Sequence, residues 1–134
     1  MRRSVDEDHF TVLEAFRPNS MTNPYLLQLT AALEELVDVQ TLSWSRLLSG
    51  RYDVLHLHWP EVLVRGQNAW KTVVRCVAFV CVLVVARGRR RGIVRTLHNI
   101  EPHERLDPVR RAILSLADRW TTEWITLTTA TSPP

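Results

Sequence analysis

Strand-like and helix-like segments alternate along almost the whole chain, and this alternation is the feature that most constrains its fold. Two helix-like segments open with Asn23-Pro24 and Asp107-Pro108. Asn and Asp cap helices well, and proline suits the first helical position because its missing N–H would be unpaired there. Strands are expected at 9–16, 37–44, 52–59, 92–97 and 123–128, and helices at 24–36, 69–86 and 108–116. We therefore predict an α/β fold: a Rossmann-like, doubly wound and mostly parallel sheet of about five strands, with helices on both faces.

The length of the chain, 134 residues, fits a single domain. With 46% apolar residues the chain can bury a core, and its charged fraction of 23% is ordinary for a soluble globule. We assign residues 9–129 to a Rossmann-like domain, 1–8 to an N-terminal tail and 130–134 to a C-terminal tail.

The N-terminus and the cysteines both favour a cytoplasmic location. Acidic residues soon follow Met1, where a signal peptide would need an apolar stretch. Cys76 and Cys81 lie within one apolar run, in which cysteine behaves as a small buried hydrophobe. We therefore expect no disulfide framework.

An apolar, valine-rich run from Thr72 to Ala86 is followed by a cluster of arginines. A bilayer span takes ~20 apolar residues and Arg75 interrupts this run, so we expect a buried helix instead. The many valines also permit a strand. Peripheral contact with the inner face of the plasma membrane is a third alternative. Its acidic head groups would then meet Arg87, Arg89, Arg90 and Arg91.

Several classes of function fit the sequence poorly. The glycines, at positions 50, 66, 88 and 92, cannot form the phosphate-binding loops of dinucleotide-binding proteins or NTPases. No serine-hydrolase elbow occurs in the sequence. The arginine-rich stretch 87–95 contains no aromatic residue, so we expect no nucleic-acid partner. We expect no cofactor.

Polar side chains gather where the expected strands end. The third strand ends in the block 56–61 (HLHWPE) and the fourth in the block 96–104 (TLHNIEPHE). In open parallel sheets, ligands bind outside the carboxyl ends of the strands. The candidate residues at this edge are Asn19, Asn23, His58, Trp59, Glu61, His98, Asn99, Glu101 and His103. Such side chains suit sugars, whose hydroxyls both donate and accept hydrogen bonds.

His56 and His58 are two residues apart on an expected strand, so they point to the same face of the sheet. Because His56 lies inside the strand, we expect it to be a hydrogen-bonded core residue. A zinc site on these two residues, with His98 or His103 as a third ligand, is an alternative. No cysteine pair has the spacing of zinc ligands, and we expect no metal.

Three blocks of the sequence resemble one protein family. They are Asn23-Pro24-Tyr25, the block 53–61 (DVLHLHWPE) and the block 95–104 (RTLHNIEPHE). In this order they are similar to the N-terminal domain of bacterial GT-B fold glycosyltransferases that build exopolysaccharides and glycolipids, including mannosyltransferase-like members. The likeness covers nearly the whole chain.

The resemblance implies one half of a GT-B fold, in which two Rossmann-like domains face a cleft. The N-terminal domain mainly receives the acceptor, here a glycolipid or polysaccharide, and the C-terminal domain binds the nucleotide-sugar donor. By the same resemblance, His98 lies near the transferred sugar, while His58 and Glu61 line the acceptor side. If a base deprotonates the acceptor hydroxyl, Glu61, Glu101 or a neutral His58 could serve by type.

The expected function is therefore that of the acceptor-binding half of a glycosyltransferase. Because the 134 residues hold no second α/β domain for the donor, we expect the chain to be inactive alone. The alternative is a non-enzymatic Rossmann-like module that docks on a membrane or on a partner enzyme.

Overall fold

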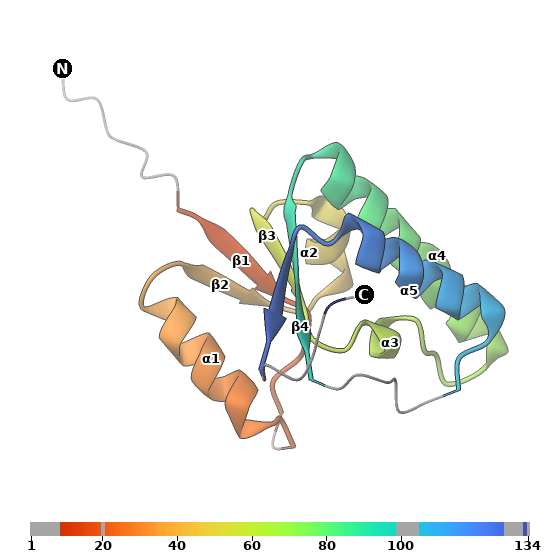
Figure 1. The fold of residues 1–134 in the computed structure, drawn as a ribbon, viewed down its shortest axis with the longest axis horizontal. Helices are drawn as coiled ribbons and strands as arrows, with labels where there is room; N and C mark the ends of the chain where they lie inside the picture. The colour runs from red at the N-terminus through yellow and green to blue at the C-terminus, as the bar shows by residue number, and fades with distance from the viewer. Residues whose placement is uncertain (1–8, 20, 99–104, 128–132, 134) are drawn as a thin grey trace.

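Five parallel strands form one sheet in the order β2-β1-β3-β4-β5 (Figure 1). The computed structural model describes residues 9–19, 21–98, 105–127 and 133. The strands are β1 (Thr11–Glu14), β2 (Asp38–Thr41), β3 (Val54–Leu57), β4 (Gly92–Leu97) and β5 (Glu123–Thr126). All five expected strands are present. The bounds of β4 and the start of β5 are as expected, and the other strand ends differ from the expected bounds by one to three residues.

Helices cover both faces of the sheet, as the alternating pattern predicts. They are α1 (Pro24–Glu34), α2 (Trp44–Ser49), α3 (Pro60–Leu63), α4 (Ala69–Gly88) and α5 (Pro108–Trp120). The first helix, α1, lies on one side of the sheet, and the other four lie on the opposite side (Figure 1). The predicted Rossmann-like α/β architecture is thus confirmed.

Side-chain caps start the three longer helices. The Oδ1 atom of Asn23 accepts the N–H of Tyr25 at 3.0 Å, and Asp107 accepts that of Arg110 at 2.9 Å. Asn68 caps α4 in the same way, through the N–H of Lys71. Each cap satisfies a backbone donor that has no partner inside the helix, and such a cap contributes about 1 kcal/mol.

The sequence pattern missed the two short helices. Trp44 was expected at the end of the second strand, but it is the first residue of α2. Trp59 was expected in the third strand, but it precedes α3 and Pro60 is the first residue of that helix. Proline has no N–H to donate to a neighbouring strand, and it is well suited to begin a helix. The strand therefore ends before Pro60.

The core lies between the sheet and helices α2 to α5. Alternation along the strands directs Leu13, Leu55 and Ile93 into this layer, where they are fully buried together with Phe79 of α4. The alternate residues of the same strands point to the α1 side of the sheet. Glu14, His56 and Thr96 are among them, and they are the buried polar members of the sheet.

The valine-rich segment forms helix α4, which confirms the expectation of a helix over a strand, but only one stripe of this helix is buried. Its buried stripe consists of Cys76, Phe79, Val82, Leu83 and Ala86. By length and composition alone, this is the one helix of the described residues that could cross a membrane, with a mean hydropathy of 2.0. The stripe packed on the sheet is what a core helix requires.

Helix α4 ends at Gly88, two residues beyond the expected bound. The left-handed backbone that usually follows a helix is adopted by Arg90, with φ of 55°. A second left-handed residue, Gly50, follows α2 with φ of 62°. A Cβ at Gly50 would lie 2.6 Å from the Arg89 side chain, so this turn requires glycine.

Candidate functional site

The candidate residues converge where the chain reverses its direction of travel across the sheet. Strand β1 leads to α1 on one face, whereas the adjacent β3 leads to α3 and α4 on the other (Figure 1). The two exit loops therefore diverge at the carboxyl edge. In open parallel sheets this divergence is the point at which ligands bind.

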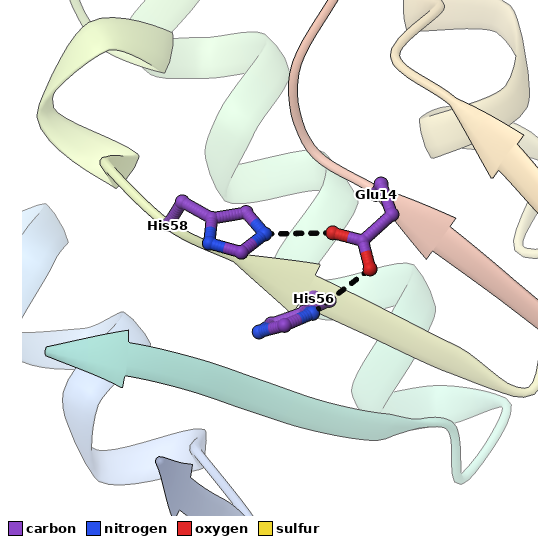
Figure 2. A group of neighbouring side chains, drawn as sticks. All are labelled: Glu14, His56 and His58. Atoms are coloured by element: carbon purple, nitrogen blue, oxygen red, sulfur yellow. Dashed lines mark hydrogen bonds and ion pairs between the residues drawn. The ribbon is translucent and has the colours of Figure 1, made fainter. Parts of the chain in front are cut away.

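A carboxylate bridges two imidazoles at this edge. Glu14, the last residue of β1, contacts Nδ1 of His56 through Oε1 at 3.0 Å. Its Oε2 atom contacts Nε2 of His58 at 2.7 Å. Figure 2 shows the carboxylate between the two rings. All three side chains are buried, and Glu14 has no exposed surface at all.

Strand register produces this arrangement. Glu14 pairs with His56 across β1 and β3, so both side chains point to the same face. On the far side of His56, its Nε2 atom bonds the hydroxyl of Thr96 in β4 at 2.8 Å. His56 is therefore a hydrogen-bonded core residue, as expected from its place inside a strand.

The cluster keeps Glu14 ionised. Burial by itself would raise the pKa of Glu14, but the hydrogen bonds from His56 and His58 and the charges of these rings outweigh it and lower the pKa. Burying an unpaired carboxylate would be strongly unfavourable, so the two imidazoles are required wherever Glu14 stands.

His98 connects the buried cluster to the surface. Its Nε2 atom lies 3.4 Å from Nδ1 of His58, at the long end of the hydrogen-bond range. Its ring stacks on Trp59, with centroids 4.3 Å apart and planes 21° apart. Tyr25 of α1 meets the same ring edge-on at 5.7 Å. Three rings from two segments, those of the adjacent His58 and Trp59 and that of Tyr25, thus fix the orientation of the His98 imidazole.

His58 and His98 are neighbours, as their positions at two strand ends predict. They differ in access, because the side chain of His58 is fully buried whereas His98 is partly exposed. Burial lowers the pKa of His98, and positive charge on His58 or His56, when these rings are protonated, lowers it further. At neutral pH, His98 is therefore an uncharged imidazole that can accept a hydrogen bond.

Glu14, His56 and His58 are also the residues that could hold a metal ion. One ligand atom from each lies within 4.8 Å of the others. This set differs from the expected zinc alternative, since a carboxylate stands where a third histidine was considered. The contacts of 2.7 and 3.0 Å are hydrogen-bond distances, and Thr96 and His98 occupy the other ring nitrogens. Hydrogen bonds alone therefore satisfy the cluster.

Two of the three predicted asparagines, Asn19 and Asn23, have local structural roles. Asn23 caps α1. The Oδ1 atom of Asn19 accepts the N–H of Met21 at 2.8 Å, and its own N–H donates to the hydroxyl of Thr22. Both residues are exposed on the loop that follows β1, so they line the same edge of the sheet without contacting the histidines.

Glu61 interacts electrostatically with Arg95. Its charge raises the pKa of Arg95, against a larger lowering by burial. Arg95 also forms an ion pair with Asp118 and lies 5.4 Å above the ring of Trp124. Within the described ranges, no hydrogen bond joins Glu61 to His58 or His98. Three other predicted site residues, Asn99, Glu101 and His103, lie outside the described residues.

Sequence reasoning missed Glu14, Thr96 and Tyr25 as members of the site. Glu14 carried a signal, because a charged residue in an otherwise apolar strand needs a buried partner. Tyr25 lies in one of the three family-like blocks, but nothing in the spacing of residues relates it to His98.

The predicted anion-binding arginines lie at the opposite edge of the sheet. All three of Arg87, Arg89 and Arg90 are exposed: Arg87 lies in the last turn of α4, and the other two lie in the turn that leads into the start of β4. Arg91 is half-buried and forms an ion pair with Asp53 at 3.1 Å. His98 follows the other end of β4, so the arginines and the histidines are separated by the length of the strand.

An apolar groove of about 530 Å³ runs between α4 and α5. Val73, Val77 and Val80 line it from α4, and Val109 and Ile113 line it from α5. The groove lies on the outer side of the helical layer, and none of the predicted site residues contributes to its lining.

Comparison with known proteins identifies a bacterial enzyme to which the chain is similar. No protein-family model matches the chain. Over 135 aligned residues and 98% of its own length, the chain is 41% identical to a GDP-mannose:glycolipid 4-beta-D-mannosyltransferase from Xanthomonas campestris pv. campestris. The enzyme of that name from one strain of the pathovar matches equally well. The chain spans 39% of the length of these relatives. The similarity confirms the resemblance that the three sequence blocks indicate.

Proposed function

Since this chain is a relative of a bacterial glycolipid mannosyltransferase, we propose that it forms the acceptor side of a glycosyl-transfer site. The identity of 41% over almost the entire chain is the observation that carries the proposal. The donor would be GDP-mannose and the acceptor a glycolipid, as in the name of the relative.

The geometry at the carboxyl edge supports a sugar-handling surface. His98 is uncharged at neutral pH, partly exposed and fixed by the rings of Trp59 and Tyr25. A neutral imidazole can accept a hydrogen bond, or a proton, from a sugar hydroxyl. We propose that His98 contacts the reacting sugar and that Trp59 and the loop residues Asn19 and Asn23 line the acceptor side.

The remaining predicted site residues differ in what supports them. Glu61 interacts electrostatically with Arg95, so it is proposed as an acceptor-side contact and not as the partner of His98. Glu101, Asn99 and His103 stay predictions from the family-like block that contains them.

Binding of the donor is proposed to need the part of the relative that this chain does not span. Glycosyl transfer gains from preorganised charge around the departing diphosphate and from exclusion of water. The chain spans 39% of the relative's length, and we expect no mannosyl transfer by these residues alone.

A chimera tests the proposed function. Residues 9–127 would replace the aligned stretch of the Xanthomonas enzyme, and transfer from radiolabelled GDP-mannose to its glycolipid acceptor would be measured. We expect the chimera to be active, and we expect H98A in the chimera to lower kcat by at least about 100-fold. The matched control is Leu36→Ser, at an exposed position just after α1. A folded chimera that binds GDP-mannose yet transfers none, or an unchanged rate for H98A, would contradict the proposal.

A second candidate function, docking on a membrane, has its own observation. The solvent face of α4 carries an apolar stripe that continues along the helix at helical spacing. Its members are Trp70, Val73, Val74, Val77 and Val84, each about half or more exposed. Lys71 and Arg75 flank the first turns of the stripe. An interfacial helix combines such features, with aliphatic side chains in the lipid and basic ones at the head groups.

A further inference from the structure

The direction of each hydrogen bond in the buried cluster follows from the charge of Glu14. An ionised carboxylate only accepts hydrogen bonds. The ring nitrogens that face it, Nδ1 of His56 and Nε2 of His58, must therefore both carry protons. Glu14 thus selects one tautomer of each neutral ring, and the tautomers of the two rings differ.

The tautomer of His58 determines the tautomer of His98, because the two rings share a hydrogen bond. With its proton on Nε2, a neutral His58 presents a lone pair on Nδ1. The partner of that lone pair is Nε2 of His98, so this nitrogen donates. A neutral His98 then has its lone pair on Nδ1, and no described residue forms a hydrogen bond with that atom.

The other end of the chain of hydrogen bonds is closed by a hydroxyl. His56 carries its proton on Nδ1, so its Nε2 accepts the O–H of Thr96. A hydroxyl can donate or accept, so Thr96 adapts to either tautomer of His56. The carboxylate is the member of the cluster that cannot adapt, and it sets the direction for all the others.

We propose that Glu14 is a positioning residue, which acts through His58 to hold His98 in the tautomer whose unprotonated Nδ1 accepts a hydrogen bond from a sugar hydroxyl. The inference rests on the proposed function, in which His98 faces the reacting sugar. A buried carboxylate is a poor device for stability, because apolar residues of similar volume often replace buried charged groups without loss. A role in setting the tautomer accounts for its presence at this position.

Nitrogen NMR on the chain itself tests the proposal. Long-range ¹H–¹⁵N spectra of histidine-labelled protein report which ring nitrogen carries the proton. We expect the proton on Nδ1 in His56 and on Nε2 in both His58 and His98. A proton on Nδ1 of His58, or on Nδ1 of His98 at neutral pH, overturns the proposal without any variant.

Substitution of Glu14 supplies the second arm. In E14Q the side chain offers one acceptor and one donor, so one of the two rings must switch its tautomer. T96V removes the hydroxyl that a switched His56 would need, which leaves His58 to switch. In the double variant E14Q/T96V we expect His58 to move its proton to Nδ1, and His98 to respond by moving its own proton to Nδ1.

T96V alone is the matched control, since Glu14 is then intact and the proton should stay on Nε2 of His98. An unchanged His98 in the folded double variant would overturn the proposal. In the chimera, E14Q/T96V should lower kcat by at least about tenfold while KM for GDP-mannose stays within twofold. Expected tautomers together with an H98A chimera of unchanged rate would instead refute the proposed function and leave the positioning network standing.

Discussion

The imidazole of His98 lies almost parallel to the indole of Trp59, with 4.3 Å between their centroids. This stack joins the end of β4 to the residue before α3, two segments about forty positions apart. It covers one face of the imidazole, and the His58 ring and the Tyr25 ring meet it from other directions.

The first prediction concerns the titration of His98. Its pKa is lowered from 6.5, first by burial and then by positive charge on His58 or His56 when these rings are protonated. We expect the ¹H NMR titration midpoint of His98 to lie below 6.5 in the folded chain and to return to about 6.5 in urea. Trp59→Leu should raise the folded midpoint, because it uncovers the ring. A midpoint above 6.5 in the folded protein would show that His98 is charged where we expect it to be neutral.

The second prediction concerns acid and Glu14. The folded-state pKa of Glu14 is lowered from 4.5, so its contribution to stability is present above pH 4.5 and is lost as the pH falls through the lower folded value. The difference in unfolding free energy between the wild type and E14Q should therefore shrink below pH 4.5. Urea unfolding at a series of pH values measures it.

Replacement of Glu14 by alanine provides a second comparison of unfolding free energies. E14A leaves two buried imidazole N–H groups without an acceptor, so it should cost about 3–5 kcal/mol at pH 7. E14Q retains an acceptor and should cost less. Equal costs for the two variants would mean that the cluster contributes little as a hydrogen-bonded unit.

The third prediction concerns the turn at Gly50. Its φ is 62°, and an added Cβ would lie 2.6 Å from Cδ of Arg89 and 2.7 Å from the Val85 side chain. Gly50→Ala should lower the unfolding free energy by about 2–4 kcal/mol. Gly88→Ala is the matched control, because nothing lies within 4 Å of its added Cβ. That control should be neutral or stabilise by up to about 1 kcal/mol, and urea unfolding distinguishes the two.

The fourth prediction concerns vesicle binding. If α4 docks on lipid, Val74→Ser/Val77→Ser should weaken co-sedimentation with acidic vesicles by about tenfold or more, since each valine buries its side chain in lipid. Arg89→Gln/Arg90→Gln tests the arginine cluster separately, and Leu36→Ser is the apolar control on the α1 side. No binding of the wild type, or an equal loss with Leu36→Ser, would exclude docking through this stripe.

The sequence predicted most of the fold because its signals were local. Asn23, Asn68 and Asp107 act on the first turn of their own helices, so their effect can be derived from neighbouring residues. The short helices escaped prediction because the apolar pattern of Trp44 and Trp59 continues that of the strands before them. Only packing against the rest of the fold distinguishes these residues from strand residues.

The site could be predicted in part for a similar reason. Topology brings strand ends together, so His58 and His98 were correctly expected to be neighbours. The role of Glu14 depends on the register between β1 and β3, and register is a property of two strands at once. The access of each ring depends in turn on the packing of Tyr25, Phe16 and Trp59, which no single segment of sequence encodes.

The length of α4, which at about 30 Å exceeds the height of the sheet, limits how the molecule could rest on a bilayer. Standing on Arg87 to Arg90, it would raise His98 above the lipid by the height of β4, about 20 Å. Lying on the valines of α4, it would keep both sheet edges level with the head groups. If the chain receives a glycolipid acceptor as proposed, a short glycan would then reach the histidine without leaving its lipid anchor.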